Sequence, residues 1–230
     1  MAKHIGIAAV SPEGAAVCYR DIARACALRL GNEPHPIVTL HNLPFAAYRA
    51  AIDKDDWARV GEMLLESAQA LSRAGAEFCF SPDNLVQHAV EAAAPRSPIP
   101  WLRLTELVAK AVLASGHKIV GLIGTKKVMT GSTYQAALGL KGVRVIPPAV
   151  PDLDMIDRII FDELIKGEVR DESRVKLVGA IEYMKEAGAG GVILGSSEAP
   201  LILNAGNSPL PVYDTMALLA DGAVEMSLAG

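Results

Sequence analysis

Short hydrophobic runs alternate with longer amphipathic stretches along almost the whole chain. The runs are continuous and rich in branched residues, which is typical of strands buried on both faces of a sheet. The expected strands are His4–Val10, Ile37–His41, Glu77–Ser81, Lys118–Ile123, Val143–Ile146, Gly191–Leu194 and Pro211–Val212. The expected helices are Glu13–Leu30, Asp55–Ala74, Asn84–Ala94, Leu102–Ser115, Val128–Leu138, Asp152–Ile165, Asp171–Ala187 and Asp214–Leu228. This alternation predicts an α/β fold with mainly parallel sheets.

A weak internal repeat suggests two similar lobes. Lys3–Ile7 resembles Lys118–Leu122, and Ala74–Phe78 resembles Ala187–Gly191, at offsets of 115 and 113 residues. Chance similarity between βα units is the competing explanation. We expect residues 1–98 plus 211–230 to form the first lobe and residues 99–210 to form the second.

The repeat also pairs two predicted strand ends, Ser81–Asn84 and Gly195–Glu198. Open parallel sheets bind ligands outside the carboxyl ends of their strands. We therefore expect a ligand cleft between the two lobes.

Composition narrows the classes of partner and cofactor. The net charge is −4, and no block of five like charges occurs, so neither nucleic acid nor a membrane is an expected partner. Three cysteines, with no signal peptide or transmembrane run, favour a cytoplasmic location. No CxxC, HExxH or histidine cluster is present, so no metal is expected. Ala8–Ser11 lacks a glycine-rich phosphate loop, which argues against a flavin-binding or phosphate-binding relative and leaves no expected cofactor.

Five stretches, in matching order, resemble the aspartate/glutamate racemase superfamily. They are Ile5–Ile7 with Ser11–Glu13 and Tyr19–Arg20, Val120–Thr125, Arg158–Val169, Gly191–Leu201 and Pro211–Thr215. The resemblance implies two pseudo-symmetric flavodoxin-like lobes, with the last helix returning to the first lobe. It further implies cofactor-independent inversion at the α-carbon of an acidic amino acid by two cysteine thiols, and a possible homodimer.

The same resemblance shows where this chain departs from the family. The family motif Cys-x-Asn-Thr-x-His matches Pro82–Gln87, where only Asn84 is retained. Ser196 stands at the second cysteine position, and Leu219 stands where a further histidine is usual. Proline carries no side-chain base and a serine hydroxyl is a far weaker acid than a thiol, so a two-thiol mechanism cannot run at Pro82 and Ser196.

Three residues at the two strand ends are candidates for catalysis. Asp83 is a substitute base, with a turn or capping role as the alternative. Glu198 is an orienting group or acid, with a first-turn acid as its alternative. Ser196 is a nucleophile only if a base activates it; the alternatives are an ordinary helix cap and a turn whose backbone N–H groups bind a carboxylate.

Six further residues are candidates for binding the ligand. Lys166 matches a family lysine, and Arg49 aligns roughly with a family arginine, so both are possible carboxylate clamps. The other candidates are Asn84, Thr125, Ser197 and Thr215, which caps and turns would explain equally well.

Two functions therefore stay open. The first is an enzyme that acts on a small amino acid or dicarboxylate by non-cysteine chemistry, as an isomerase, lyase or decarboxylase. The second is a catalytically inactive protein that binds a small carboxylate on the same fold. Exchange of the α-proton with solvent deuterium distinguishes them.

Overall fold

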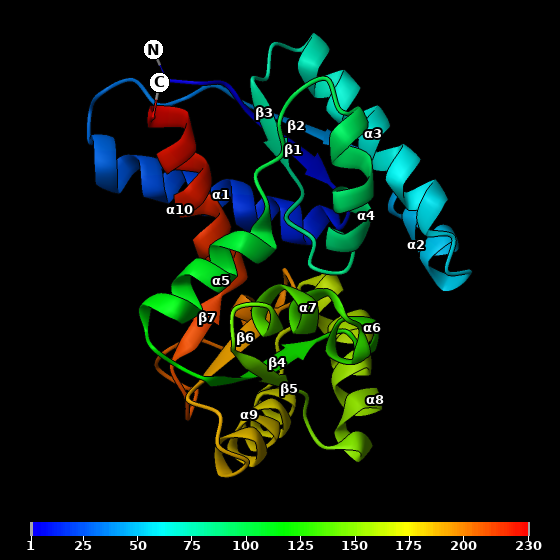
Figure 1. Cartoon of the computed structure of the whole chain (residues 1–230), viewed down its shortest axis with the longest axis vertical. Helices are drawn as coiled ribbons and strands as arrows, with labels where there is room; N and C mark the ends of the chain where they lie inside the picture. The colour runs from blue at the N-terminus through cyan, green and yellow to red at the C-terminus, as the bar shows by residue number, and fades with distance from the viewer. Residues whose placement is uncertain (1, 230) are drawn as a thin grey trace. The chain divides into compact units, whose positions relative to one another are not determined.

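The computed structural model, which describes residues 2–229, divides into two units that each surround a parallel sheet (Figure 1). The first unit comprises Met1–Leu104 with Leu219–Gly230, and the second comprises Thr105–Leu218. The lobe boundaries and the cleft expected from the sequence stay predictions.

The sheet of the first unit has the strand order β2-β1-β3. Its strands are β1 (Ile5–Ala9), β2 (Val38–Asn42) and β3 (Phe78–Phe80), all parallel. Its helices are α1 (Pro12–Leu30), α2 (Phe45–Asp53), α3 (Trp57–Arg73) and α4 (Gln87–Ala93), followed by a short 3-10 turn, η1 (Ala94–Arg96). Apolar residues of α2, α3 and α4 pack with β1 and β3 into one core, and α3 lies beside α4 in Figure 1.

The sheet of the second unit has four parallel strands in the order β5-β4-β6-β7. They are β4 (Ile119–Gly124), β5 (Arg144–Ile146), β6 (Gly191–Gly195) and β7 (Val212–Asp214). The helical segments along this part of the chain are α5 (Leu104–Ala114), α6 (Lys126–Thr130), α7 (Thr133–Gly139), α8 (Val150–Arg158), η2 (Ile159–Glu163), η3 (Leu164–Lys166), α9 (Asp171–Glu186) and η4 (Ala199–Leu201). A second core joins α8, η2 and α9 to β4 and β6.

The last helix, α10 (Thr215–Leu228), begins in the second unit and ends in the first. The Lys3 amide donates to the Ser227 carbonyl at 2.8 Å, and the Ser227 hydroxyl donates to the Lys3 carbonyl at 2.6 Å. These bonds place the end of α10 beside the start of the chain, as Figure 1 shows. The last helix therefore returns to the first unit, as the resemblance implied.

Most expected elements form, and two of the expected helices are wrong in detail. The single helix expected over Val128–Leu138 is two short helices, α6 and α7, because Gly131 adopts an extended conformation between them. The expected helix Asp152–Ile165 is regular only in α8 and continues as a π-helical turn, η2, and a 3-10 turn, η3. Helix α2 was not expected at all, and its first turn has no side-chain cap.

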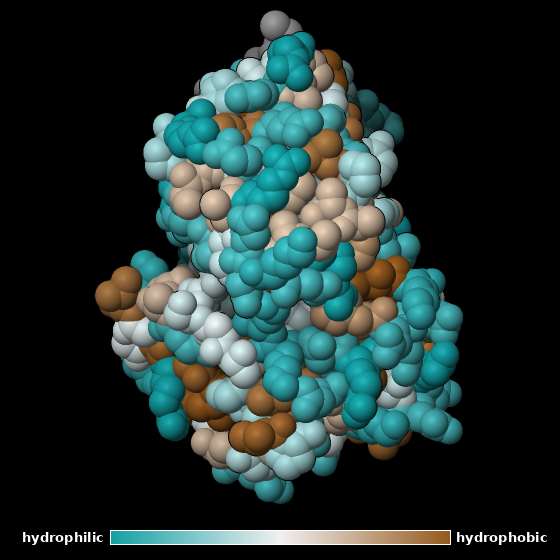
Figure 2. Space-filling view, turned by 90° about the vertical axis from the view of Figure 1, so that its right-hand side faces the viewer, coloured by the Kyte–Doolittle hydropathy of each residue, from teal (hydrophilic) through white to brown (hydrophobic). Residues whose placement is uncertain are grey.

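Hydrophilic residues predominate on the face of the chain shown in Figure 2, and hydrophobic residues are interspersed among them. Within residues 2–229, no helix has the length and hydrophobicity needed to cross a membrane.

Candidate functional site

The turn after β3 is held together by its own side chains. The Asp83 carboxylate oxygen Oδ1 accepts hydrogen bonds from the backbone amides of Leu85 at 2.8 Å and Val86 at 3.3 Å. The Gln87 amide nitrogen Nε2 donates to the carbonyl oxygens of Ser81 at 3.1 Å and Asp83 at 2.6 Å. One oxygen of the Asp83 carboxylate therefore acts as a cap, which is the alternative that the sequence left open.

The same turn holds little that could serve as a base or a nucleophile. Pro82 and Asn84 are buried, and Ser81 has a buried hydroxyl with no hydrogen-bond partner in the described part of the chain. Cys79 lies in β3, and burial raises the pKa of its thiol well above the usual range, so the thiolate form is disfavoured. His88, one residue beyond Gln87, lies on the exposed side of α4 against the Trp57 ring.

The turn after β6 concentrates a carboxylate and two hydroxyls. The Glu198 oxygen Oε2 accepts hydrogen bonds from the hydroxyls of Ser196 at 2.9 Å and Ser197 at 3.0 Å. The Glu198 amide in turn donates to the Ser196 Oγ at 3.3 Å. All three residues are at most 4% exposed. Two hydroxyl donors fix the orientation of this carboxyl group, as a general base requires.

The neighbouring strand ends of the second sheet add two threonines. Gly124 pairs with Gly195, so Thr125 and Ser196 each follow directly after adjacent paired strands. The Thr125 hydroxyl is buried and has no hydrogen-bond partner among the residues that the structure describes. In contrast, the Thr215 hydroxyl donates to the Leu194 carbonyl at 2.6 Å.

The two cationic candidates have different surroundings. Arg49 lies on α2, where its Nε bonds both oxygens of Asp53 at 2.9 and 3.0 Å. Lys166 is exposed at the end of η3, and its ammonium group has no ion-pair partner within residues 2–229. Gly167 follows with a positive φ of 74°, which reverses the chain direction there.

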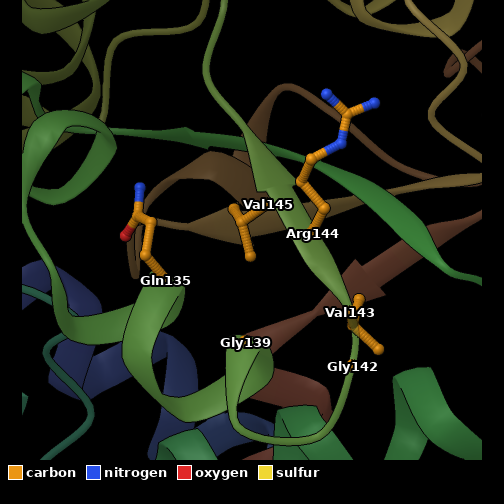
Figure 3. A pocket seen from close by; sticks show the side chains of 6 residues that line it. All are labelled: Gln135, Gly139, Gly142, Val143, Arg144 and Val145. Carbon is orange, nitrogen blue, oxygen red and sulfur yellow. The ribbon is translucent and has the colours of Figure 1, made fainter.

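Two cavities in the second unit lie outside these turns. One, of about 390 Å³, opens between α7 and β5; in Figure 3 the side chains of Gln135 and Val145 lie on the two sides of this space, whereas Arg144 points away. The other, of about 320 Å³, is lined by Met155, Arg158, Ile159, Asp162, Glu163, Arg170 and Lys176. None of the nine candidate residues lines either cavity. No group of three His, Cys, Asp or Glu side chains in the described residues is arranged to hold a metal ion.

Parallel sheets flanked by helices, with polar side chains in the turns at the carboxyl ends of their strands, are typical of α/β proteins that bind ligands. Comparison with known proteins identifies the family. The chain belongs to the Asp/Glu/Hydantoin racemase family, whose model matches residues 7–223. The superfamily and the fold class predicted from the sequence are thereby confirmed.

Solved structures agree with this assignment. A candidate Asp/Glu racemase from Yersinia pestis is 28% identical, with a TM-score of 0.88 over 98% of this chain and 99% of its own. An aspartate racemase homologue from Pyrococcus horikoshii is 26% identical, with a TM-score of 0.85 over the same shares of the two chains. Glutamate racemase from Francisella tularensis, solved in complex with D-glutamate, shares the fold at 15% identity and a TM-score of 0.65, over 99% of this chain and 80% of its own.

Sequence reasoning nominated Asp83, Asn84, Ser196, Ser197 and Glu198 at the two turns, and their roles stay predictions. It missed Gln87 as a contributor, because it weighed that residue only as the replacement of a histidine. It also passed over the buried hydroxyl of Ser81. Burial of a polar side chain between β3 and α4 is the feature that marks both residues, and it is visible only in the structure.

Proposed function

We propose that this protein is a cofactor-independent member of the racemase family that takes a small amino acid or dicarboxylate and moves a proton with Glu198. The observation that carries the proposal is the buried Glu198 carboxylate with its two serine donors. Family membership supports the class of substrate. The absence of a cysteine at positions 82 and 196 supports chemistry other than a two-thiol racemase.

The proposed step begins at the carbon beside the ligand carboxylate. Glu198 takes the proton from that carbon, and the electron pair of the broken C–H bond moves into the adjacent carboxyl group as an enolate. Such a carbon acid is very weak, so the step requires a positioned base and hydrogen-bond donors for the developing charge. The unpartnered hydroxyl of Thr125 is the proposed donor, and Lys166 is the proposed cation for a carboxylate of the ligand.

The proposed chemistry is one-sided. Pro82 carries no side-chain base, and Asp83 already accepts two backbone hydrogen bonds. A proton removed by Glu198 would return from the same side, or the enolate would lose a leaving group. Exchange with retention and elimination are therefore the proposed reaction types, and rapid racemisation is not.

A second candidate is a protein that binds a small carboxylate without turning it over. The observation that favours it is the extent of internal hydrogen bonding. Side-chain groups of four candidates already bond other groups of the same chain: Asp83, Ser196, Ser197 and Thr215. The polar turns would then serve only recognition.

Proton NMR in deuterium oxide distinguishes the two candidates. The purified protein is incubated with L-aspartate, L-glutamate and a panel of dicarboxylates, and the α-proton signal is followed together with the chirality of the amino acid. The proposal expects loss of the signal with retention of chirality, or release of a new product. Ligand-induced shifts without exchange would instead support the second candidate, a protein that binds a carboxylate without turning it over.

A matched pair of variants assigns the base. Glu198→Gln keeps the size and a hydrogen-bonding capacity of the side chain but removes the carboxylate. Glu182→Gln is the control, because Glu182 lies on the exposed side of α9. Exchange that survives Glu198→Gln would reject the proposed role of Glu198.

The homodimer and the cytoplasmic location expected from the sequence stay predictions, which light scattering and cell fractionation would test.

A further inference from the structure

Gln87 is a buried polar residue whose side chain spans the turn after β3. It is 3% exposed and is the first residue of α4. Its Nε2 donates to the carbonyl oxygens of residues four and six positions earlier, Asp83 at 2.6 Å and Ser81 at 3.1 Å. These two carbonyls flank Pro82, so a single amide group joins both sides of the proline.

The chemistry of the side chain explains why this position requires glutamine. A primary amide nitrogen carries two protons and can donate to two acceptors at once. Each histidine nitrogen carries at most one proton, and an ionised glutamate carries none. Buried carbonyl groups that lose their donor destabilise the conformation that buries them, so the two bonds depend on an amide at position 87.

Three backbone positions of the turn cannot supply these donors. Pro82 has no backbone N–H, and the amides of Leu85 and Val86 already donate to Asp83. The Asp83 carboxylate accepts from the chain that follows it, while the Asp83 carbonyl accepts from Gln87. Asp83 is therefore fixed through both its side chain and its backbone, and Asn84 is held between these two attachments.

We infer that Gln87 is a positioning residue, which fixes the turn after β3 and with it the Asn84 amide, the candidate donor of this turn to a small carboxylate. The inference rests on the proposed function for the ligand and on the hydrogen bonds of the turn for the positioning. Gln87 touches no ligand in this assignment and acts only through the residues that it holds.

Hydrogen exchange tests the positioning without any ligand. Gln87→Leu removes both donors, Gln87→His retains one, and Gln69→Leu on the exposed side of α3 is the control. We expect the amides of Leu85 and Val86 to exchange about 10-fold faster or more in Gln87→Leu, since the loss of one buried hydrogen bond changes an opening equilibrium by about that factor. Gln87→His is expected to restore part of the protection, and Gln69→Leu to leave it unchanged.

Gln87→Glu supplies a readout that a purely structural role would not move. Ionised at pH 8, the new carboxylate cannot donate and lies close to two carbonyl oxygens and to Asp83. Protonated at lower pH, it donates one hydrogen bond. We therefore expect the affinity of this variant for L-aspartate or succinate to rise about 10-fold between pH 8 and pH 5.5, while the affinity of the unmodified protein stays nearly constant.

Three results would overturn the inference. They are unchanged protection of Leu85 and Val86 in Gln87→Leu, ligand affinity of Gln87→Leu equal to that of Gln69→Leu, and a pH dependence of Gln87→Glu that matches the unmodified protein. If the unmodified protein neither binds a carboxylate nor exchanges an α-proton, the proposed function fails instead. The hydrogen-exchange comparison then still decides whether Gln87 positions the turn.

Discussion

The turns after β3 and β6 each follow a buried parallel strand that pairs with the first strand of its own unit. The first turn consists of a proline, an aspartate that caps its own backbone and a glutamine that joins two carbonyls. The second consists of two serines that converge on one buried glutamate. In the first turn the side chains of Asp83 and Gln87 bond the backbone, whereas in the second the side chains also bond one another.

The two units therefore share the strand and the turn that follows it, but they differ in the chemical groups that the turn carries. The repeat in the sequence reproduces the strand and the turn in both units, but it does not reproduce the reactive groups. In the first turn the carboxylate, Asp83, accepts hydrogen bonds from the backbone, whereas in the second the carboxylate, Glu198, accepts them from side-chain hydroxyls. The comparison therefore supports one-sided chemistry more than a symmetric reaction.

The largest expected effect is a difference in α-proton exchange rate between variants of the two carboxylates, Glu198 and Asp83. Glu198→Gln should lower any α-proton exchange by at least about 100-fold, the usual contribution of a positioned general base. Asp83→Asn should change the rate less than about twofold, because asparagine caps a turn as well as aspartate does. Exchange rates from proton NMR in deuterium oxide, measured at equal folded concentration, give both values. The opposite order would place the base in the first unit and reverse the comparison.

A second prediction concerns the strand ends just before the two helix caps. Val10 precedes Ser11 after β1, whereas Gly124 precedes Thr125 after β4. A Cβ at position 124 would lie 2.6 Å from the Gly195 carbonyl oxygen, so Gly124→Ala should destabilise the fold by about 1–3 kcal/mol. Urea unfolding measures this change. Gly139→Ala is the control, because no atom lies within 4 Å of its added Cβ; equal stability of the two variants would contradict the close approach of β4 and β6.

A third prediction compares the two caps themselves. The Ser11 hydroxyl accepts a hydrogen bond from the Gly14 amide at 3.2 Å, so Ser11→Ala should cost about 1 kcal/mol. The Thr125 hydroxyl is buried without a hydrogen bond in the described residues, so Thr125→Val should leave the free energy of unfolding unchanged or raise it. The same Thr125→Val change should weaken carboxylate binding in a titration. Equal loss of stability in both variants would show that Thr125 caps its helix and is not reserved for a ligand.

Much of the fold was predictable from the hydrophobic pattern, because buried parallel strands are continuous apolar runs. The helices expected to end at Leu30, Ala74, Ser115 and Ala187 end within one residue of those positions, and the glycine that follows each expected end has a positive φ that other residues adopt only with strain. Helix α2 escaped prediction because Pro44 precedes it with no side-chain cap. The break between α6 and α7 escaped because one glycine inside a helical pattern is usually tolerated.

The candidate site was predictable only in part. Residue type and position after a strand identified Asp83, Ser196 and Glu198, but not the atoms that they bond. Gln87 reaches carbonyls that the turn brings near it, and this geometry is set by the fold of residues 81–87 as a whole. Likewise, Glu198 is buried because β6 lies between β4 and β7, which no local pattern specifies.

The smallest expected effect is a difference in acid sensitivity between the units. Desolvation lowers the pKa of His88 in the first unit, where its ring meets Trp57 with centroids 4.0 Å apart. Because the unfolded chain binds a proton more readily, the contribution of neutral His88 to stability is complete above about pH 6.5 and declines as the pH falls towards its folded-state pKa.

Asp154 in the second unit behaves differently. A hydrogen bond from Lys126 lowers its pKa, so its contribution is lost only at a pH below the usual aspartate range. Hydrogen exchange between pH 7.5 and pH 5 should therefore show faster exchange in α4 than in α8 as the solution becomes acidic. Substituting His88→Gln should remove that difference. If α8 loosens first, or if the difference persists without His88, the acid sensitivity of the first unit has another origin.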